Sequence, residues 1–245
     1  MDRLIYTAMS GMSDSMVRQR VIASNMANAQ TVGFRAEMLY STPVTLKGPA
    51  LEARAMTEGE VRGADMTAGS ITQTGRALDI AIQGEALLAV QAQDGGEAYT
   101  RRGDLTISPT GVLQNGDGRP VIGEGGPITL PLGADVMIAN DGAVLVRDPA
   151  APDAPPTEVA RIKLASPTGS AIMKGVDGLF RVPGEGVLPA DENAKVVSGA
   201  LEQSNVKPTE VIVQMIEAQR LFDIRTKLIA TARDVDESGT ALMRL

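Results

Sequence analysis

The distribution of glycine and proline is the feature that most constrains the fold of this 245-residue chain. Residues 79–198 are about half of the chain, yet they contain 17 of the 26 glycines and 11 of the 14 prolines. Both residue types disfavour helix interiors, glycine through its conformational freedom and proline through its missing N–H. The sequence therefore predicts a helical segment, a turn-rich middle and a second helical segment.

The first helical segment contains an apolar repeat. Apolar residues recur at alternating spacings of four and three, with Gln19 in the one polar position, and they are Ile5, Met9, Met12, Met16, Ala23 and Met26. This 3.5-residue period predicts an amphipathic helix over roughly residues 3–28, with Asp2 at its N-cap. At about 1.5 Å per residue the helix would be nearly 40 Å long, which is more than a small domain can cover.

The second helical segment is expected to begin near Ser204 or Asn205, because either residue can cap a helix and Pro208 suits a first turn. We expect this helix to run to roughly Glu237 and to end at Gly239. Its apolar residues form two adjoining stripes. The first is Val211, Met215, Ala218 and Phe222, the second is Leu221, Ile224, Leu228 and Val235, and the residues that widen them are Ile212, Ile216 and Ile229.

Each terminal helix is too long to be covered by the middle of the chain, so the sequence predicts that the two helices pair as a coiled-coil-like module. Their outer faces would then meet other copies of the chain. Together with a β-rich middle this makes an α+β protein. The predicted parts are an N-terminal helix in residues 1–34, an extended connector in 35–78, a central β domain in 79–198 and a C-terminal helix in 199–245.

The central part is predicted to be all-β because short apolar runs alternate with turn signals. The runs are residues 80–82, 86–90, 105–107, 128–130, 136–138, 143–146 and 159–164. The turn signals are glycine-rich, as tight hairpins require, and lie at residues 94–96, 115–118, 123–126 and 140–142. The proline-rich segment 149–156 cannot donate into a strand ladder at its prolines, so we expect a surface loop there.

The composition excludes several kinds of chemistry. The chain has no cysteine and no histidine, so it has no disulfide, no thiolate nucleophile, no Ser-His-Asp triad and no zinc site built from either residue. Its net charge of −7 and low aromatic content argue against nucleic-acid binding. It has no apolar stretch of the ~18 residues that a membrane span needs, and its N-terminus lacks the apolar core of a secretory signal. We therefore expect a soluble chain with no metal and no cofactor.

Four groups of residues are candidates for catalytic or anion sites. Residues 123–126 resemble a phosphate loop but lack its Lys-Ser/Thr, so a turn is favoured. Asp191–Glu192 and the group Asp234, Asp236 and Glu237 could be the paired carboxylates of a glycosidase, but no aromatic residue accompanies them. In residues 99–104, a local pair between one arginine and Asp104 is favoured, with the other arginine facing outward. The sequence thus predicts no catalytic residue.

Four segments of the chain resemble the flagellar rod and hook protein family. They are residues 24–35 (SNMANAQTVGFR), residues 78–84 (LDIAIQG), residues 99–104 (YTRRGD) with the later 111–113, 120–123 and 126–128, and residues 199–206 (GALEQSNV) followed by 215–220 (MIEAQR). The segments span nearly the whole chain in the family's order. One departure is that Glu85-Ala86-Leu87-Leu88 stands where the family usually has Gly-Phe-Phe after Gly84.

The resemblance implies a non-enzymatic subunit of the axial rod of the bacterial flagellar basal body. Such a subunit leaves the cell through the flagellar type III export apparatus without a cleavable secretory signal. It assembles helically with copies of itself and with other rod proteins, so that the terminal helices form an inner tube, which is the wall of the export channel, and transmit torque. The opening MDRLIYTAMSGM and the length resemble the proximal-rod member, and the distal-rod paralogue is the alternative.

The resemblance and the helical periodicity together predict an assembly interface. Its expected residues are Ile5, Met9, Met12, Met16, Ala23, Met26, Asn28, Gly33, Phe34, Ser204, Asn205, Val211, Ile212, Met215, Ile216, Phe222 and Ile229. Two other classes of function stay open. A carbohydrate-active enzyme would need convergent carboxylates beside a stacking aromatic, and a monomeric binding module would need its termini packed on itself.

Overall fold

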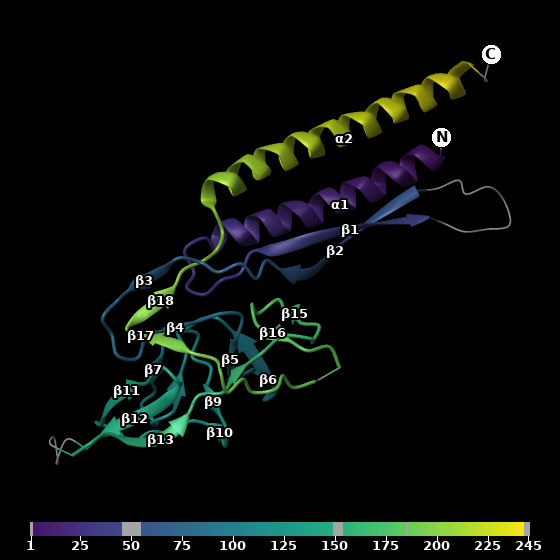
Figure 1. The fold of residues 1–245 in the computed structure, drawn as a ribbon. Helices are drawn as coiled ribbons and strands as arrows, with labels where there is room; N and C mark the ends of the chain where they lie inside the picture. Colours follow the sequence, from purple (N-terminus) through teal and green to yellow (C-terminus); the bar gives the residue numbers. More distant parts are fainter. Residues whose placement is uncertain (1, 46–54, 149–153, 185, 243–245) are drawn as a thin grey trace. The chain divides into compact units, whose positions relative to one another are not determined.

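The computed structural model describes residues 2–45, 55–148, 154–184 and 186–242. The chain separates into two compact units (Figure 1). The helical unit comprises Met1–Ala27, Glu37–Gly63 and Lys207–Leu245, and the β unit comprises Asn28–Ala36 and Ala64–Val206. The chain thus passes between the units four times, so that the β unit includes the segments that follow the first helix and precede the second.

The helical unit contains the two long helices and a strand pair. Helix α1 spans Asp2–Ala27 and helix α2 spans Pro208–Leu242, and they run side by side in opposite directions (Figure 1). Strands β1 (Glu37–Thr45) and β2 (Ala55–Ala64) form a two-stranded sheet. Strand β1 is fastened to the end of α1, because Asn25 exchanges two hydrogen bonds with the Glu37 backbone, of 2.8 and 3.1 Å.

The β unit is built from short strands, most of them paired antiparallel. They are β3 (Ile71–Gln73), β4 (Ile80–Ile82), β5 (Leu87–Gln91), β6 (Glu97–Thr100), β7 (Thr106–Ile107), β8 (Leu113–Gln114), β9 (Ile122–Gly123), β10 (Gly126–Pro127), β11 (Asp135–Ile138), β12 (Ala143–Arg147), β13 (Thr157–Arg161), β14 (Leu164–Ala165), β15 (Met173–Lys174), β16 (Phe180–Arg181), β17 (Val196–Ser198) and β18 (Ala200–Glu202). The largest sheet has the order β14-β5-β6-β16-β15, and a second has the order β11-β12-β13. Strands β17 and β18, close to the end of the unit, pair with β4 and β3 near its start.

Strand β5 separates two apolar cores in the β unit. Alternate residues of a strand point to opposite faces, so Leu88 and Val90 enter the larger core while Leu87 and Ala89 enter the smaller one with Tyr99. All five side chains are fully buried. Aliphatic residues thus account for the buried side chains of β5 on both faces of the strand.

Most of the expected β elements are present. The turn signals are confirmed by glycines in the left-handed region, such as Gly95 (φ 85°) and Gly142 (φ 82°). The glycine-rich segment at residues 123–126 is a hairpin turn, as β9 and β10 pair across it. The run at 128–130 forms an isolated bridge through Thr129 instead of a strand. Residues 149–153 of the proline-rich segment lie outside the described residues.

The predicted ends of the second helix were wrong at both sides. Helix α2 begins at Pro208, and neither Ser204 nor Asn205 caps it, because their side chains accept hydrogen bonds from the Val206 and Ala36 N–H groups. At its other end α2 continues through Gly239 to Leu242. A single helical glycine costs only about 1 kcal/mol, which does not oblige the helix to stop.

The segment expected to be an extended connector contains strands. Residues 37–45 and 55–64 form β1 and β2, and residues 71–73 form β3. The pairing partners of β3 lie in β18, about 130 positions later in the chain. No local sequence pattern can report a partner at that distance.

Candidate assembly interface and buried ion cluster

The face of α2 that lies against α1 follows a heptad-like spacing. Its least exposed residues recur at intervals of seven, four, three, four and three, and they are Val211, Ala218, Phe222, Arg225, Ile229 and Ala232. The Arg225 guanidinium donates to the Gly11 carbonyl and the Ser15 hydroxyl of α1. Beside this face, a hollow of about 440 Å³ is lined by residues of both helices, including Ala23, Met215 and Phe222. Apolar packing between the helices is therefore incomplete in the single chain.

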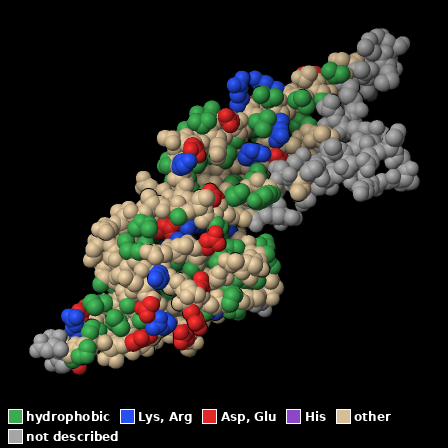
Figure 2. All heavy atoms as spheres, in the orientation of Figure 1, with side chains coloured by type: hydrophobic (Ala, Val, Ile, Leu, Met, Phe, Trp, Pro, Cys, Tyr) green, Lys and Arg blue, Asp and Glu red, His purple; other side chains and the backbone are tan. Residues whose placement is uncertain are grey.

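A second apolar stripe on α2 is exposed. Leu221, Ile224, Leu228 and Val235 are 37–52% exposed, and at about 100° per residue they project roughly 90° around the helix from the Val211 face. Ile212 and Ile216 add apolar surface, and Ile216 is 63% exposed. Figure 2 shows hydrophobic side chains at the surface beside lysine and arginine in this region. Several large apolar side chains exposed along one helix make it a candidate interaction site.

The predicted methionine stripe of α1 is also largely at the surface. Met9 is 57% exposed and Met16 is 60% exposed, while Met12 and Met26 are half-buried and Ala23 is exposed. The side chain of Ile5 lies outside the described residues. Among the described side chains of α1, the buried ones are instead partly polar, and they are Asp14, Ser15, Val21, Ile22 and Asn25.

The remaining predicted interface residues lie in the β unit. Gly33 is buried, and Asn28, Phe34, Ser204 and Asn205 are half-buried. The Phe34 ring lies 3.4 Å from the Lys174 ammonium, which also donates to the Arg35 carbonyl at 2.8 Å. The Asn205 side chain donates to the carbonyls of Asp65 and Thr67. These residues fasten the segments 28–36 and 203–206 within their own unit.

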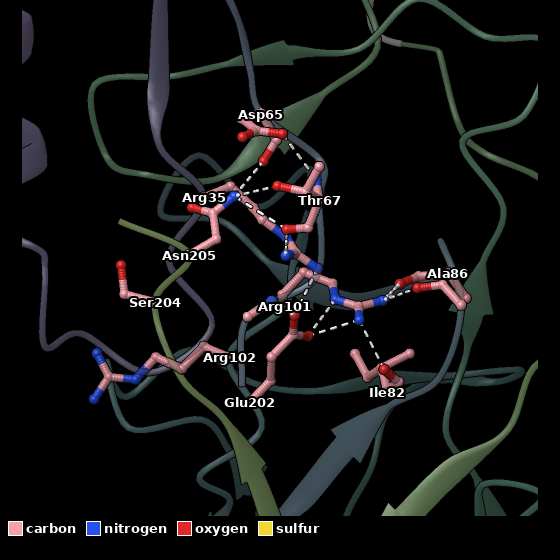
Figure 3. Close-up of polar contacts among 12 residues, drawn as sticks. Arg35, Asp65, Thr67, Ile82, Ala86, Arg101, Arg102, Glu202, Ser204 and Asn205 are labelled. Carbon is pink, nitrogen blue, oxygen red and sulfur yellow. Dashed lines mark hydrogen bonds and ion pairs between the residues drawn. The ribbon is translucent and has the colours of Figure 1, made fainter. Parts of the chain in front are cut away.

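A buried ion cluster lies among these segments (Figure 3). Its centre is the Glu202 carboxylate, which is paired with Arg35 at 2.7 Å and with Arg101 at 2.6 Å. All three side chains are only 2% exposed. The Arg101 guanidinium also donates to the backbone carbonyls of Ile82, Gly84 and Ala86. This set of bonds satisfies Arg101 without help from solvent.

Arg35 is less completely satisfied. Its guanidinium donates to the Thr67 carbonyl and pairs with Glu202, but its Nε has no hydrogen-bond partner. Burial lowers the pKa of Arg35 from its ordinary value, and the neighbouring Glu202 carboxylate opposes this shift. With two guanidinium groups and one carboxylate, the cluster depends on Glu202 for its charge balance.

The backbone around the cluster is closely packed. Gly33 has φ of 66°, and a Cβ at this position would lie 2.4 Å from the Arg101 carbonyl. A Cβ at Gly69 would lie 1.9 Å from the Gln203 carbonyl oxygen. Larger residues cannot be placed at either position without moving the backbone, so Gly33 lets its segment approach Arg101 and Gly69 lets its segment approach Gln203.

The four sequence signatures meet at this cluster. Arg35 ends the first, Ile82 and Gly84 belong to the second, Arg101 to the third and Glu202 to the fourth. The expectation that one arginine of residues 99–104 would face outward was wrong, because Arg101 is buried. Its neighbour Arg102 does pair with Asp104, at 2.7 Å, and with Asp117. Sequence spacing could not reveal the cluster because its members lie on distant segments.

The partners and the exposure of the carboxylates considered for catalysis indicate structural roles. Asp191 and Glu192 line a hollow of about 290 Å³ with Asp141, Arg161 and Lys163. Hydrogen bonding from Arg161 lowers the pKa of Asp141, whereas a general acid at neutral pH needs a raised pKa. On α2, Asp234 is exposed and Glu237 accepts a hydrogen bond from Arg233. Among the described residues, no three acidic side chains lie close enough together to hold a metal ion.

Three family models match the chain. The flagella basal body rod protein model matches residues 5–35, the flagellar hook protein FlgE/F/G D1 domain matches 81–146, and the flagellar basal body rod FlgEFG protein C-terminal model matches 197–242. These matches include α1, much of the β unit and α2. No described helix has the length and apolar character needed to cross a membrane.

The chain belongs to the flagellar basal-body rod protein family. It is 43% identical to the flagellar basal-body rod protein FlgF of Salmonella typhimurium, with 100% of both chains aligned. It is 42% identical to FlgF of Escherichia coli strain K12 over 96% of this chain and 95% of that protein. The rod protein FlgG of Bacillus subtilis is 31% identical over 99% of both chains.

Proposed function

We propose that this chain is a structural subunit of the proximal flagellar rod and that it assembles through its two terminal helices. It is a structural protein and not an enzyme, in keeping with its relatives. The proximal assignment is supported by the identities of 43% and 42% with two FlgF proteins, against 31% with a FlgG protein. A distal-rod paralogue is the alternative.

The observation that carries this proposal is the apolar surface of the helical unit. Helix α2 has an apolar stripe next to α1 and a second stripe, at residues 221, 224, 228 and 235, that stays 37–52% exposed. Burial of apolar area stabilises an interface by roughly 25 cal/mol per Å². A helix with two apolar sides is suited to pack between a partner helix in its own chain and helices of neighbouring subunits.

The proposed interface comprises the predicted residues of α1 and α2 with three additions. Met9, Met16, Ile212, Met215 and Ile216 carry exposed apolar area, and Ile224, Leu228 and Val235 extend it along α2. These three residues were part of the second stripe in the sequence, and their spacing was the signal for including them. In the assembly, α1 and α2 would pack in a coiled-coil-like manner and form an inner tube, with the β unit outside.

The partners of the subunit would be copies of itself and other proximal and distal rod proteins. Delivery would use the flagellar export apparatus, and the assembled subunit would lie in the rod that spans the periplasm. The rod would transmit torque and enclose the export channel. The family resemblance supports these features, and the exposed helix surface supports assembly with other subunits.

The interface can be tested by placing a charge on it. In a strain that lacks this subunit, Ile216→Asp is expected to abolish swimming and rod incorporation, because burying an unpaired carboxylate costs several kcal/mol or forces it to protonate. The purified monomer should unfold at the parental temperature, since Ile216 is 63% exposed. Incorporation is measured by immunoblotting isolated basal bodies.

The matched control is Val176→Asp, which makes the same kind of change at a fully exposed turn of the β unit. This variant should swim and enter the rod normally. Normal incorporation of Ile216→Asp would show that the interface has been placed on the wrong surface. Met12→Asp tests the half-buried part of the α1 stripe in the same way.

A further inference from the structure

The buried ion cluster joins three stretches of the β unit that are distant in sequence. Residues 28–36 follow α1, residues 64–70 follow β2, and residues 199–206 precede α2. Glu202 lies 101 positions from Arg101 in the chain and still farther from Arg35. Closing loops of this length costs conformational entropy, so the contacts depend on strong interactions at the point of closure.

Backbone hydrogen bonds around Glu202 connect the same three stretches. The Gly33 N–H donates to the Glu202 carbonyl at 2.8 Å, and the Gly69 N–H donates to the Glu202 carboxylate at 2.8 Å. Three more backbone hydrogen bonds join the same stretches. The N–H groups of Asp65, Gln203 and Asn205 donate to the carbonyls of Ala36, Ser70 and Phe34, respectively. Each stretch is thus bonded to the others and not only to the sheets.

The charges make Glu202 decisive within this arrangement. Its carboxylate is the shared partner of two buried guanidinium groups, while most of the other bonds of Arg35 and Arg101 go to neutral carbonyls. Without the carboxylate, two like charges would remain buried together. A buried cation without a counter-charge is strongly unfavourable, and the accessible relief is for the stretches to separate and admit water.

We propose that Glu202 is a latch that orders the segment leaving α1 and the segment entering α2 in a single step. When the carboxylate joins both arginines, residues 28–36, 64–70 and 203–206 become ordered together. When it is missing, all three open together, while the cores around β5 and β6 stay closed. The latch therefore couples the ordering of the segment after α1 to the ordering of the segment before α2. This proposal does not depend on the assignment to the rod.

The test is hydrogen–deuterium exchange, followed by mass spectrometry, on the full-length protein and its Glu202→Gln variant. Glutamine keeps the size and one acceptor oxygen but removes the charge. Peptides that cover residues 28–36, 64–70 and 203–206 should all exchange about tenfold faster or more, and peptides that cover 87–100 should keep the parental rate. If residues 203–206 exchange faster while 28–36 keep the parental rate, the latch is refuted.

Two further variants complete the experiment. Asp104→Asn also neutralises a carboxylate bonded to an arginine of the β unit, but outside the cluster, and it should leave the three stretches at parental rates. Arg35→Met leaves Arg101 paired with Glu202, so it still tests the proposal if Glu202→Gln unfolds as a whole. With this variant, joint loosening of 28–36 and 203–206 supports the latch. Loosening of 28–36 alone overturns it.

Discussion

The two units of the molecule differ in how much of their apolar surface they cover. In the β unit, two cores include residues such as Leu88, Val90 and Leu113 that are completely buried. In the helical unit, the described buried apolar residues are few, namely Val21, Ile22, Val211 and Ala218, whereas both helices expose large apolar side chains. The β unit therefore has the core of a protein that is stable by itself.

The two units thus use apolar surface in two different ways within one chain. Apolar area buried within a chain stabilises its fold, whereas area left exposed remains available for association. Long helices gain most of their stability from packing and not from intrinsic propensity. We infer that the β unit is folded before assembly and that the helical unit reaches full stability only when neighbouring subunits cover its stripes.

The largest effect is expected from a truncation in the β-unit core. Leu88→Ala removes a fully buried side chain and should lower the free energy of unfolding of the β unit by about 2–5 kcal/mol. Leu228→Ala removes the same group from a half-exposed position of α2 and should change monomer stability by no more than about 0.5 kcal/mol. Thermal and urea unfolding of the monomer measure both.

Assembly should rank these two variants in the opposite order. Leu228→Ala is expected to reduce incorporation into the rod although the monomer is as stable as the parent. A large loss of monomer stability in Leu228→Ala would mean that α2 is already covered in the single chain, and the contrast between the units would then fail.

The parts of the fold that could be predicted from the sequence are those marked by local patterns. The 3.5-residue period found both helices, and glycine-rich turns such as the one at Gly142 marked the hairpins. The β18–β3 pair and the cluster around Glu202 were missed, because each joins residues over a hundred positions apart. One of the two arginines at 101 and 102 was expected to face outward, because adjacent strand residues point to opposite faces, and the distant partner of Arg101 was not visible from its neighbours in the sequence.

A glycine substitution tests whether the stability of the β unit extends to the segment that leaves α1. Gly33→Ala requires an alanine at φ of 66° and places its Cβ 2.4 Å from the Arg101 backbone. The left-handed conformation costs roughly 1–2 kcal/mol, and the overlap should add about 1–3 kcal/mol. Unfolding of the β unit, followed by circular dichroism, measures the total loss.

Gly75→Ala is the control for this experiment. Gly75 has φ of 74°, but a Cβ there would meet no atom within 4 Å, so only the conformational cost applies. The two variants should therefore differ by the cost of the overlap. Equal losses would show that the backbone at Gly33 can move away from Arg101, and that the segment is not held tightly by the β unit.

The smallest effect is expected at a surface ion pair, and it tests whether such pairs contribute to the stability of the β unit alongside its cores. Hydrogen bonding from Arg181 lowers the pKa of Asp177, with a bond of 2.7 Å between the two side chains. A carboxyl group whose pKa is lower in the folded state stabilises the fold above its unfolded pKa of about 3.9, and this contribution is lost as the pH falls through the folded value. Partly exposed pairs of this kind contribute about 0.2–1 kcal/mol.

Asp177→Asn should therefore unfold slightly more easily than the parent at pH 7, and the two proteins should converge as the solution is acidified below pH ~4. Unfolding measured at several pH values decides the matter, because a difference that persists unchanged in acid would assign the effect to packing or to the turn at residues 175–179 and not to the charge.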